Sequence, residues 1–530
     1  MVACIFSFPG LMSESNDRHW RRFHAYVAQG MLLPARATLE ALVARDPAEV
    51  RAHLLLCEIA WKDDRLRDSV RHAMDAARVV PDDAGLIVAV VAALVRSGEC
   101  TLARECLQRP FLAGIDDPTL LWQLAGLQHG LDDHPAAMAL FERAYARAVV
   151  ETAPEFRFDY ALELSINGRL QEAETELEGC AATGTSIGRV HVELARLRRQ
   201  TPAHNHLALL DRQLALAEPG SVDQAGIEFA RYKELEDLER HDEAWSALAH
   251  ANALMAARTH YDAALEQGLH DRLRDAFPAN FTRDVDGADE GPLPIFVIGM
   301  SRSGTTLLDR ILGSHSQVRS AGELEDFGRQ LRHVAGRCTL DMLDEQILAR
   351  LPDLDYAELG RRYLAQTRWS ARRRSFYVDK LPGNWRLAGP IRRSLPRARI
   401  LNLVRDPMDV CFSNFRIFHG EVGGWSYRLS SVAHWYLEYR KIMAHWHAVM
   451  PGEILDVGYA ELVRDPESTM RGVFAFCGLE YEQGCLDLAR NPASVATLSM
   501  AQVRGSIHAD AFEEWRPYAT QLAELRLALA

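Results

Sequence analysis

Apolar residues follow a helical period through the first half of this sequence. From about Met31 to Ala264 the chain is rich in Ala, Leu, Glu and Arg, and almost no part of it alternates as a half-buried strand would. Prolines open successive units at intervals of 34 residues or slightly more, at Pro47, Pro81, Pro118 and Pro154. This spacing predicts pairs of helices that stack on one another along the chain.

The clearest unit begins at Leu121 and turns near Gly130. Large and small apolar residues alternate on either side of the turn, namely Trp122, Leu124, Ala125, Ala136, Leu140, Phe141 and Ala144. The stretch resembles degenerate tetratricopeptide repeats, about five or six of them, and a generic helical bundle is the alternative. Such repeats imply recruitment of a protein or peptide, or a structural role beside the second half of the chain. The sequence favours neither role.

The pattern changes after a segment rich in Pro, Gly and acidic residues, 277–293. Short apolar runs then alternate with helical stretches, which predicts a parallel α/β sheet with its ligands at the carboxyl ends of the strands. The strand candidates are 295–298, 376–378, 400–404 and 454–457. We therefore expect an α plus α/β protein with an N-terminal segment at 1–30, helical repeats at 31–275, a linker at 276–293 and an α/β domain at 294–530.

The first strand candidate leads into a loop that has the features of a phosphate site. Residues 294–327 read PIFVIGMSRSGTTLLDRILGSHSQVRSAGELEDF, a pattern of buried strand, Ser/Gly-rich loop and helix. Backbone N–H groups of such a loop bind anions, and its glycines let the backbone approach closely. The spacing from Gly299 to Gly304 fits the nucleotide-triphosphate P-loop, but Thr305 stands where that motif has lysine. The cation is Arg302, inside the loop, which argues against ordinary ATP or GTP hydrolysis.

A second anion site is predicted after the strand at 400–404. The strand ends at Val404, and Arg405, Asp406 and Pro407 form the turn into the next helix. Ser413 lies about two turns into that helix, on a side from which its hydroxyl can approach the arginine. Taken alone, this motif is better explained as a structural turn that starts a helix. Joined to the first loop, it predicts a nucleotide that carries phosphate at both ends of its ribose.

The two motifs together resemble the donor site of sulfotransferases that use 3′-phosphoadenosine 5′-phosphosulfate. The resemblance covers the whole chain, loosely in the repeats and specifically in the second half, and implies a P-loop-like fold. It implies that the 5′-phosphosulfate is held by Arg302, Ser303, Gly304, Thr305 and Thr306, and that the 3′-phosphate is held by Arg405 and Ser413.

Two further residues match catalytic positions of protein-tyrosine sulfotransferases, which this half resembles more than it resembles the small-molecule enzymes with a catalytic histidine. Glu323 has the family's separation from the loop arginine and is predicted to be the base. An acidic helix N-terminus formed with Glu325 and Asp326 is the alternative. Lys380 is predicted to neutralise the oxygen that bridges sulfur and phosphorus. A surface lysine before a turn proline is the alternative.

The segment near the C-terminus resembles the family's last donor-binding stretch. Ser499 matches the serine that contacts the phosphosulfate and helps the phosphate to leave, and Arg504 adds a phosphate contact. Gln502, Val503 and Trp515 keep their mutual spacing.

Three positions bear on how far the resemblance extends. Glu514 stands where the tyrosine enzymes have lysine, so that charge is missing unless Arg516 replaces it. Of the two arginines that guide acidic tyrosine peptides, one position is Glu325 here and the other is Arg329. An acidic peptide acceptor is therefore in doubt. Tyr459 matches an aromatic residue near the adenine, and a buried tyrosine that holds a helix start is an equally good interpretation.

Composition limits the classes of partner and cofactor. A chain of 530 residues is long enough for two or more domains, and its formal net charge of −13 excludes bulk attraction to nucleic acid or anionic lipid. The nine cysteines form no C-x-x-C pair and no zinc-like cluster with histidines, which predicts reduced thiols. Transfer chemistry of this kind needs no metal. With no run of membrane-spanning length, we expect a cytoplasmic protein with no membrane partner.

The sequence therefore predicts a sulfotransferase that moves a sulfuryl group in line to a hydroxyl acceptor, protein tyrosine being one candidate. The catalytic residues would be Glu323, Lys380, Arg302 and Ser499. Two alternatives stay open, a P-loop nucleotide kinase and a non-catalytic repeat adaptor with a nucleotide-binding domain. The acceptor and the oligomeric state cannot be deduced from these residues.

Overall fold

The structure is a computed structural model that describes residues 16–147, 154–182, 187–278, 291–488 and 512–530. The chain forms two compact units, and each combines segments that are distant in sequence. The first comprises Met1–Ala148 and Glu325–Trp369, and the second comprises Val149–Leu324 and Ser370–Ala530. None of the helices within the described ranges is long and apolar enough to cross a membrane.

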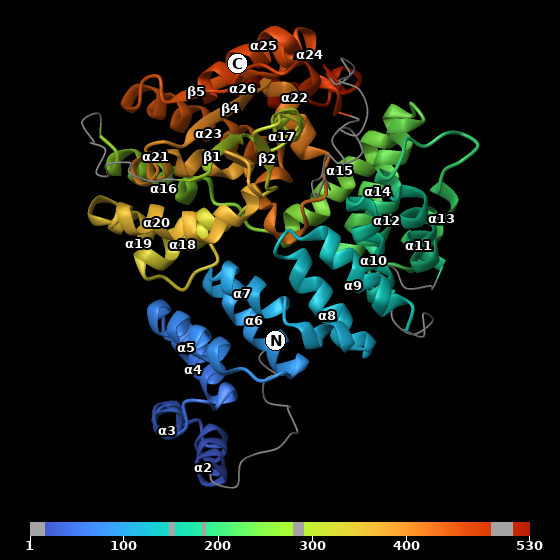
Figure 1. Ribbon diagram of the computed structural model, residues 1–530. Coiled ribbons are helices and arrows are strands. Elements are labelled where there is room, and N and C mark those ends of the chain that lie inside the picture. The colour runs from blue at the N-terminus through green and yellow to red at the C-terminus, as the bar shows by residue number, and fades with distance from the viewer. Residues whose placement is uncertain (1–15, 148–153, 183–186, 279–290, 489–511) are drawn as a thin grey trace. The chain divides into compact units, whose positions relative to one another are not determined.

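The first unit is built from helices that pack in successive pairs. α2 packs on α3, α4 on α5, α6 on α7 and α8 on α9 (Figure 1). In chain order these helices are α2 (Asp17–Ala28), α3 (Leu32–Arg45), α4 (Val50–Lys62), α5 (Leu66–Val79), α6 (Ala84–Ser97), α7 (Cys100–Leu107), η1 (Pro110–Gly114), α8 (Pro118–His129) and α9 (His134–Tyr145). The pairing is the arrangement that the apolar period predicted.

Helix α6 shows how the sequence sets these boundaries. The carboxylate of Asp83 accepts a hydrogen bond from the backbone N–H of Leu86 and caps the helix start. The helix ends at Gly98, whose φ of 81° is a left-handed conformation that glycine adopts without strain. Between them Ile87 and Leu94 are fully buried, because the apolar stripe faces the neighbouring helices.

The second segment of the first unit comes from the sequence after the phosphate-type loop. It contains α18 (Asp326–Ala335), α19 (Glu345–Arg350), η3 (Leu351–Asp353) and α20 (Tyr356–Thr367). Gln330 donates to the carbonyl of Gly98 at 2.7 Å, and the side-chain oxygen of Gln366 accepts from the backbone N–H of Thr101 at 2.8 Å. Arg362 also forms an ion pair with Glu99. A segment of the α/β half therefore packs directly on a helical repeat.

The second unit begins with more paired helices and ends with the α/β part. The helices are α10 (Pro154–Ile166), α11 (Leu170–Ala182), α12 (Gly188–Arg196), α13 (Leu207–Leu216), α14 (Val222–Asp237), α15 (His241–Arg258) and α16 (Ala263–Ala276). α10 packs on α11, α12 and α13 pack on α14, and α14 packs on α15.

Five parallel strands form the sheet, in the order β2-β3-β1-β4-β5. They are β1 (Leu293–Gly299), β2 (Val318–Ser320), β3 (Phe376–Asp379), β4 (Arg399–Val404) and β5 (Ile454–Gly458). Ile295 to Ile298 of the central strand β1 are completely buried, as expected for a strand covered on both faces. The predicted fold class, helical repeats followed by a parallel α/β domain, is confirmed.

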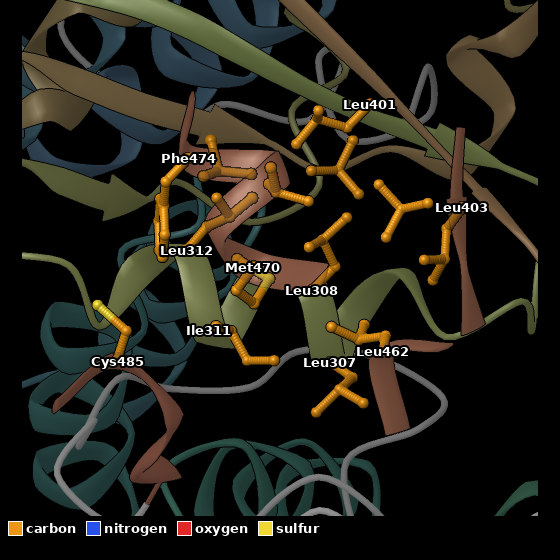
Figure 2. Close-up of a cluster of buried hydrophobic side chains, with 14 of the residues drawn as sticks. Leu307, Leu308, Ile311, Leu312, Leu401, Leu403, Leu462, Met470, Phe474 and Cys485 are labelled. Carbon is orange, nitrogen blue, oxygen red and sulfur yellow. The ribbon is translucent and has the colours of Figure 1, made fainter. Parts of the chain in front are cut away.

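The helices of the α/β part cover the sheet and position its loops. They are α17 (Thr305–Gly313), η5 (Pro382–Leu387), α21 (Ala388–Ser394), α22 (Pro407–Phe415), α23 (Leu429–Val449), α24 (Tyr459–Arg464), α25 (Pro466–Cys477) and α26 (Ala523–Leu529). Figure 2 shows the core beneath α17, where Leu308 and Leu312 meet Leu401 of β4 and Phe474 of α25. Because this face of α17 is fixed by apolar packing, the N-terminal end of the helix is held rigidly at the edge of the sheet.

Candidate functional site

The loop between β1 and α17 is shaped by two glycines. Gly299 has φ 146° and Gly304 has φ 104°, both in the region that favours glycine. A Cβ at Gly299 would lie 2.7 Å from the Leu403 carbonyl oxygen, and a Cβ at Gly304 would lie 2.5 Å from the ring of Tyr459. The backbone therefore passes too close to its neighbours for any side chain. Gly304 directly precedes α17, so the loop ends at the backbone N–H groups of the first helical turn, the kind of group that binds anions.

Arg302 connects this loop to the second predicted anion motif. Its Nε donates to Ser413 Oγ at 3.2 Å, and Arg405 Nη1 donates to the Arg302 carbonyl oxygen at 3.2 Å. The structure thus brings together all three residues that the sequence placed in two separate motifs. Burial, followed by the nearby charges of Arg196 and Arg416, lowers the pKa of Arg302 to about 9. Crowded cations of this kind favour a bound anion.

Arg405 directly follows β4, Tyr459 directly follows β5, and the two side chains contact each other. The guanidinium carbon of Arg405 lies 4.7 Å from the centre of the Tyr459 ring, within cation–π range. Arg405 Nε also lies 3.9 Å from a carboxylate oxygen of Asp409, in the first turn of α22. Tyr459 is 8% exposed and packs over Gly304 and Phe512. Tyr459 therefore touches the loop itself, as well as starting a helix.

The hydroxyl groups around the loop suit an anion with several oxygens. Ser303 Oγ is buried and has no hydrogen-bond partner among the described residues. Thr305 and Thr306 are buried in the first turn of α17. A buried hydroxyl without a partner is costly unless a ligand supplies one. The residues present therefore fit a phosphosulfate group: two glycines that allow close approach, one orphan hydroxyl, and the Arg302 and Arg405 cations.

Glu323 and Lys380 meet at the carboxyl ends of β2 and β3. Their side chains form an ion pair, and the backbone N–H of Lys380 donates to the Gly322 carbonyl at 2.9 Å. Lys380 is 1% exposed, whereas the Glu323 side chain is 38% exposed. The lysine is therefore not a surface residue, which removes the alternative interpretation of Lys380. A buried ammonium is thus paired with a carboxylate that is partly exposed to solvent.

Asp309 on α17 lies beside this ion pair. Burial raises its pKa to about 6, while the Lys380 charge and a 2.9 Å hydrogen bond from Ser320 act in the opposite direction. Glu323 adds a further upward contribution. Two acidic groups thus flank one buried lysine. The sequence contained no signal for Asp309 beyond its place four residues after Thr305, which is one helical turn.

Only some of the residues singled out near the C-terminus lie within the described ranges. Ser499, Gln502, Val503 and Arg504 lie outside the described residues. Glu514, which stands in place of the family's lysine, forms an ion pair with Arg416. Arg416 also lies 3.8 Å from Glu236 of α14.

Arg416 and Arg196 were missed by the sequence reasoning. Arg416 directly follows α22, one turn beyond Ser413, and its position in the motif offered a weak signal. Arg196 ends α12 in the helical repeats, so nothing in the local sequence connects it to the loop. Both add positive charge around Arg302. Burial, followed by the charges of Arg302 and Arg196, lowers the pKa of His419 to about 4.

Glu325 and Arg329, the positions compared with acidic-peptide guides, belong to the first compact unit. Arg329 Nη2 lies 2.8 Å from Glu325 Oε2. Arg329, the arginine that matches a guide for acidic peptides, is thus paired with Glu325, which stands at the position of the other guiding arginine.

Comparison with known proteins gives one family match and several relatives. Residues 294–483 match a family model described as the sulfotransferase family. The chain is 31% identical over 305 residues to an uncharacterized protein of Aquifex aeolicus (strain VF5), a match that covers 56% of this chain and 40% of that protein. It is 27% identical over 239 residues to a "Putative protein-tyrosine sulfotransferase" of Caenorhabditis briggsae, covering 42% of this chain and 80% of that protein.

Among solved structures, the sulfotransferase domain of the Synechococcus PCC 7002 olefin synthase is similar over 47% of this chain and 97% of its own, with 21% identity and a TM-score of 0.33. The chain spans less than half the length of its Aquifex relative. The residues that match the sulfotransferase family model, 294–483, are the same part of the chain that forms the parallel sheet behind the helical repeats.

Proposed function

We propose that this protein transfers a sulfuryl group from 3′-phosphoadenosine 5′-phosphosulfate to a hydroxyl acceptor. The observation that carries the proposal is the meeting of two anion motifs through the Arg302–Ser413 and Arg405–Arg302 hydrogen bonds. A donor with phosphate at both ends of its ribose needs two cationic sites held at a fixed separation. The family match over 294–483 supports the same reaction class.

In this proposal the loop binds the 5′ end of the donor and β4 binds the 3′ end. The phosphosulfate is held by Arg302, Ser303, Gly304, Thr305 and Thr306, together with Ser499 and Arg504, which lie outside the described residues. Arg405 and Ser413 hold the 3′-phosphate, and Tyr459 packs near the adenine. Ser413 has a second role, because it also accepts from Arg302 and so couples the two ends of the site.

In the proposed reaction the positive charge of Lys380 acts twice, first on the Glu323 carboxylate and then on the departing oxygen. Lys380 holds the Glu323 carboxylate in place by the ion pair, where it can take the proton of the acceptor hydroxyl. The acceptor oxygen then forms a bond to sulfur as the bond from sulfur to the bridging oxygen breaks. The electron pair of that bond leaves with adenosine 3′,5′-bisphosphate. Once Glu323 is protonated, the Lys380 ammonium loses its counter-charge and can neutralise the departing oxygen.

Three observations bear on the acceptor hydroxyl. A hydroxyl of a protein or peptide fits the helical repeats, which offer a surface for recruitment. Similarity to a relative named as a tyrosine sulfotransferase favours tyrosine. The Glu325–Arg329 pair argues for an acceptor without a strongly acidic flank.

Nucleotide preference tests the donor assignment against the alternative of a P-loop kinase. Thermal midpoints of the full chain are compared with saturating adenosine 3′,5′-bisphosphate and with ATP–Mg²⁺. We expect the larger increase with the bisphosphate, because Thr305 replaces the lysine that reaches the β and γ phosphates. Arg302→Met should abolish the increase, and the exposed Arg471→Met on α25 should retain it. Tighter binding of ATP–Mg²⁺ would contradict the sulfotransferase assignment.

A further inference from the structure

Four side chains with metal-binding atoms cluster in the helical part of the second unit, outside the sulfotransferase-family domain. Glu174 and Glu178 lie one turn apart on α11, and His204 and His206 lie between α12 and α13 (Figure 1). Each residue offers one oxygen or nitrogen, and these atoms all lie within 4.8 Å of one another. The cluster has no part in the sulfuryl transfer described above.

His206 is oriented as a metal-binding histidine usually is. Its Nδ1 lies 2.8 Å from Glu234 Oε1, and its backbone N–H donates to Glu234 Oε2 at 2.6 Å. A neutral imidazole that donates from Nδ1 presents a lone pair at Nε2. The side chain is 10% exposed, and Nε2 is buried without a hydrogen-bond partner among the described residues. This nitrogen points at the cluster, 3.6 Å from Glu178 Oε1.

Buried Glu234 therefore occupies the outer position of a carboxylate–histidine–metal arrangement. Glu234 belongs to α14 and its side chain is 1% exposed. Carboxylates in this position fix the tautomer and the ring direction of a ligating histidine and raise its basicity.

The segment that carries the two histidines is held in place before any ligand binds. The backbone groups of Thr201 and His204 bond to each other in both directions at 3.0 Å. The backbone N–H of Gln200 donates to a carboxylate oxygen of Asp237 at 2.7 Å, and Lys233 Nζ donates to the carbonyl of Arg198 at 2.6 Å. Because α14 anchors this segment, little ordering entropy opposes ion binding.

The distances between donors are close to those of a four-coordinate site. Zinc bonds to nitrogen and oxygen are about 2.0–2.1 Å long, which gives edges of about 3.3 Å in a tetrahedron. Here His206 Nε2 lies 3.6 Å from Glu178 and His204 Nε2 lies 3.9 Å from Glu174. The separations within the cluster reach at most 4.8 Å, and the Glu178 and His204 side chains, 49% and 59% exposed, have room to rotate toward a bound ion.

One neighbouring cation limits the role of Glu174. Arg198 Nε lies 2.6 Å from Glu174 Oε1, the oxygen nearest His204, so an ion bound to this oxygen would share it with the arginine. Two carboxylates and two neutral imidazoles still balance a charge of two. Nitrogen and oxygen donors in a four-coordinate geometry suit Zn²⁺ better than the oxygen-preferring Mg²⁺ or Ca²⁺.

We propose that Glu174, Glu178, His204 and His206 bind one divalent transition-metal ion, Zn²⁺ by preference, with Glu234 orienting His206. A bound ion would link α11 to the segment between α12 and α13 and so stabilise the packing of these helices. This site is structural, and sulfuryl transfer has no step through it.

The test measures Zn²⁺ affinity of the full chain after removal of metal by a chelator, by competition with a chromophoric chelator. The test variant is the double substitution His204→Ala with Glu178→Gln, chosen because both side chains are about half exposed and their loss should leave the fold intact. We expect the wild-type chain to bind one more Zn²⁺ than the variant, or to bind it at least about tenfold more tightly. Zn²⁺ should also raise the thermal midpoint of the wild-type chain alone.

Two further measurements make the result specific. Glu172→Gln on the same helix is the matched control, because Glu172 is exposed, pairs with Arg169 and is outside the cluster; its Zn²⁺ affinity should equal that of the wild type. Co²⁺ in place of Zn²⁺ should give the intense visible absorption of a four-coordinate ion in the wild type and lose it in the double variant. Equal Zn²⁺ stoichiometry and affinity in the wild type and the double variant would overturn the proposal.

Discussion

Replacing Arg405 by methionine separates a ligand contact from a structural contact at the second anion site. The neighbours of Arg405 among the described residues include the carbonyl of Arg302 at 3.2 Å, the Tyr459 ring at 4.7 Å and Asp409 at 3.9 Å. If these contacts are its whole role, the substitution deforms the loop and weakens every nucleotide alike. If Arg405 holds the 3′-phosphate, the loss depends on whether the ligand carries that group.

The expected magnitude follows from the bonds involved. A hydrogen bond to a charged group contributes about 1.5–3 kcal/mol, which corresponds to roughly 10- to 150-fold in affinity. The packing of the Arg405 side chain, which is 9% exposed, over buried Tyr459 is worth about 2 kcal/mol and acts on all ligands equally. We therefore expect Arg405→Met to weaken adenosine 3′,5′-bisphosphate by at least about 10-fold more than it weakens adenosine 5′-monophosphate.

Isothermal titration calorimetry measures the affinity of both nucleotides for wild type and for Arg405→Met. The four affinities form a thermodynamic cycle that isolates the contribution of the 3′-phosphate. The exposed Arg471→Met serves as the control for loss of one positive charge, and it should change neither affinity. Equal losses for the two nucleotides would refute the assignment of Arg405 to the 3′-phosphate and leave it as a support for the loop.

Two other predictions follow from the same site. Gly304→Ala places a Cβ 2.5 Å from the Tyr459 ring at φ 104°. The resulting strain of about 1–3 kcal/mol should weaken bisphosphate binding about tenfold or more. Gly328→Ala is the control, because its Cβ meets nothing within 4 Å, and it should leave bisphosphate binding unchanged. Burial raises the pKa of Asp309 from 3.8 to about 6, so the folded state binds a proton more tightly and stability falls as pH rises through that window. Asp309→Asn should remove this loss, up to about 3 kcal/mol, and its thermal midpoint should decrease less than that of wild type between pH 4.5 and pH 7. An equal decrease in both proteins would contradict the burial argument.

The sequence predicted the sheet well because its strands are short apolar runs that end in distinctive turns. The runs at 295–298, 376–378, 400–404 and 454–457 all lie within strands. β2 was missed because Val318–Ser320 has three residues, too few to show any period. The packing of the 326–367 helices on α7 was also not predictable, since an amphipathic pattern shows that a face is buried but not against which partner.

Within the candidate site, motifs located residues but did not show which of them meet. Arg302 and Ser413 are 111 positions apart, and Glu323 and Lys380 are 57 apart. The ion pair exists because β2 and β3 are neighbours, a fact that depends on the strand order. The same limit applies to the Glu174, Glu178, His204 and His206 cluster. A search for cysteine-based zinc spacing finds nothing there, because the four donors come from two segments that only the fold brings together.

Sulfate transfer by the full chain tests the central claim most directly. Labelled sulfate on 3′-phosphoadenosine 5′-phosphosulfate is offered with a peptide library and a glycan library to wild type, Glu323→Gln and Glu325→Gln. A positioned base contributes about 10²- to 10⁴-fold, so we expect transfer by wild type, loss of at least about 100-fold in Glu323→Gln and near-normal transfer in Glu325→Gln. Transfer that survives Glu323→Gln unchanged would remove Glu323 as the base, and absence of transfer from wild type to every acceptor would contradict the assignment of a sulfotransferase and favour a non-catalytic adaptor.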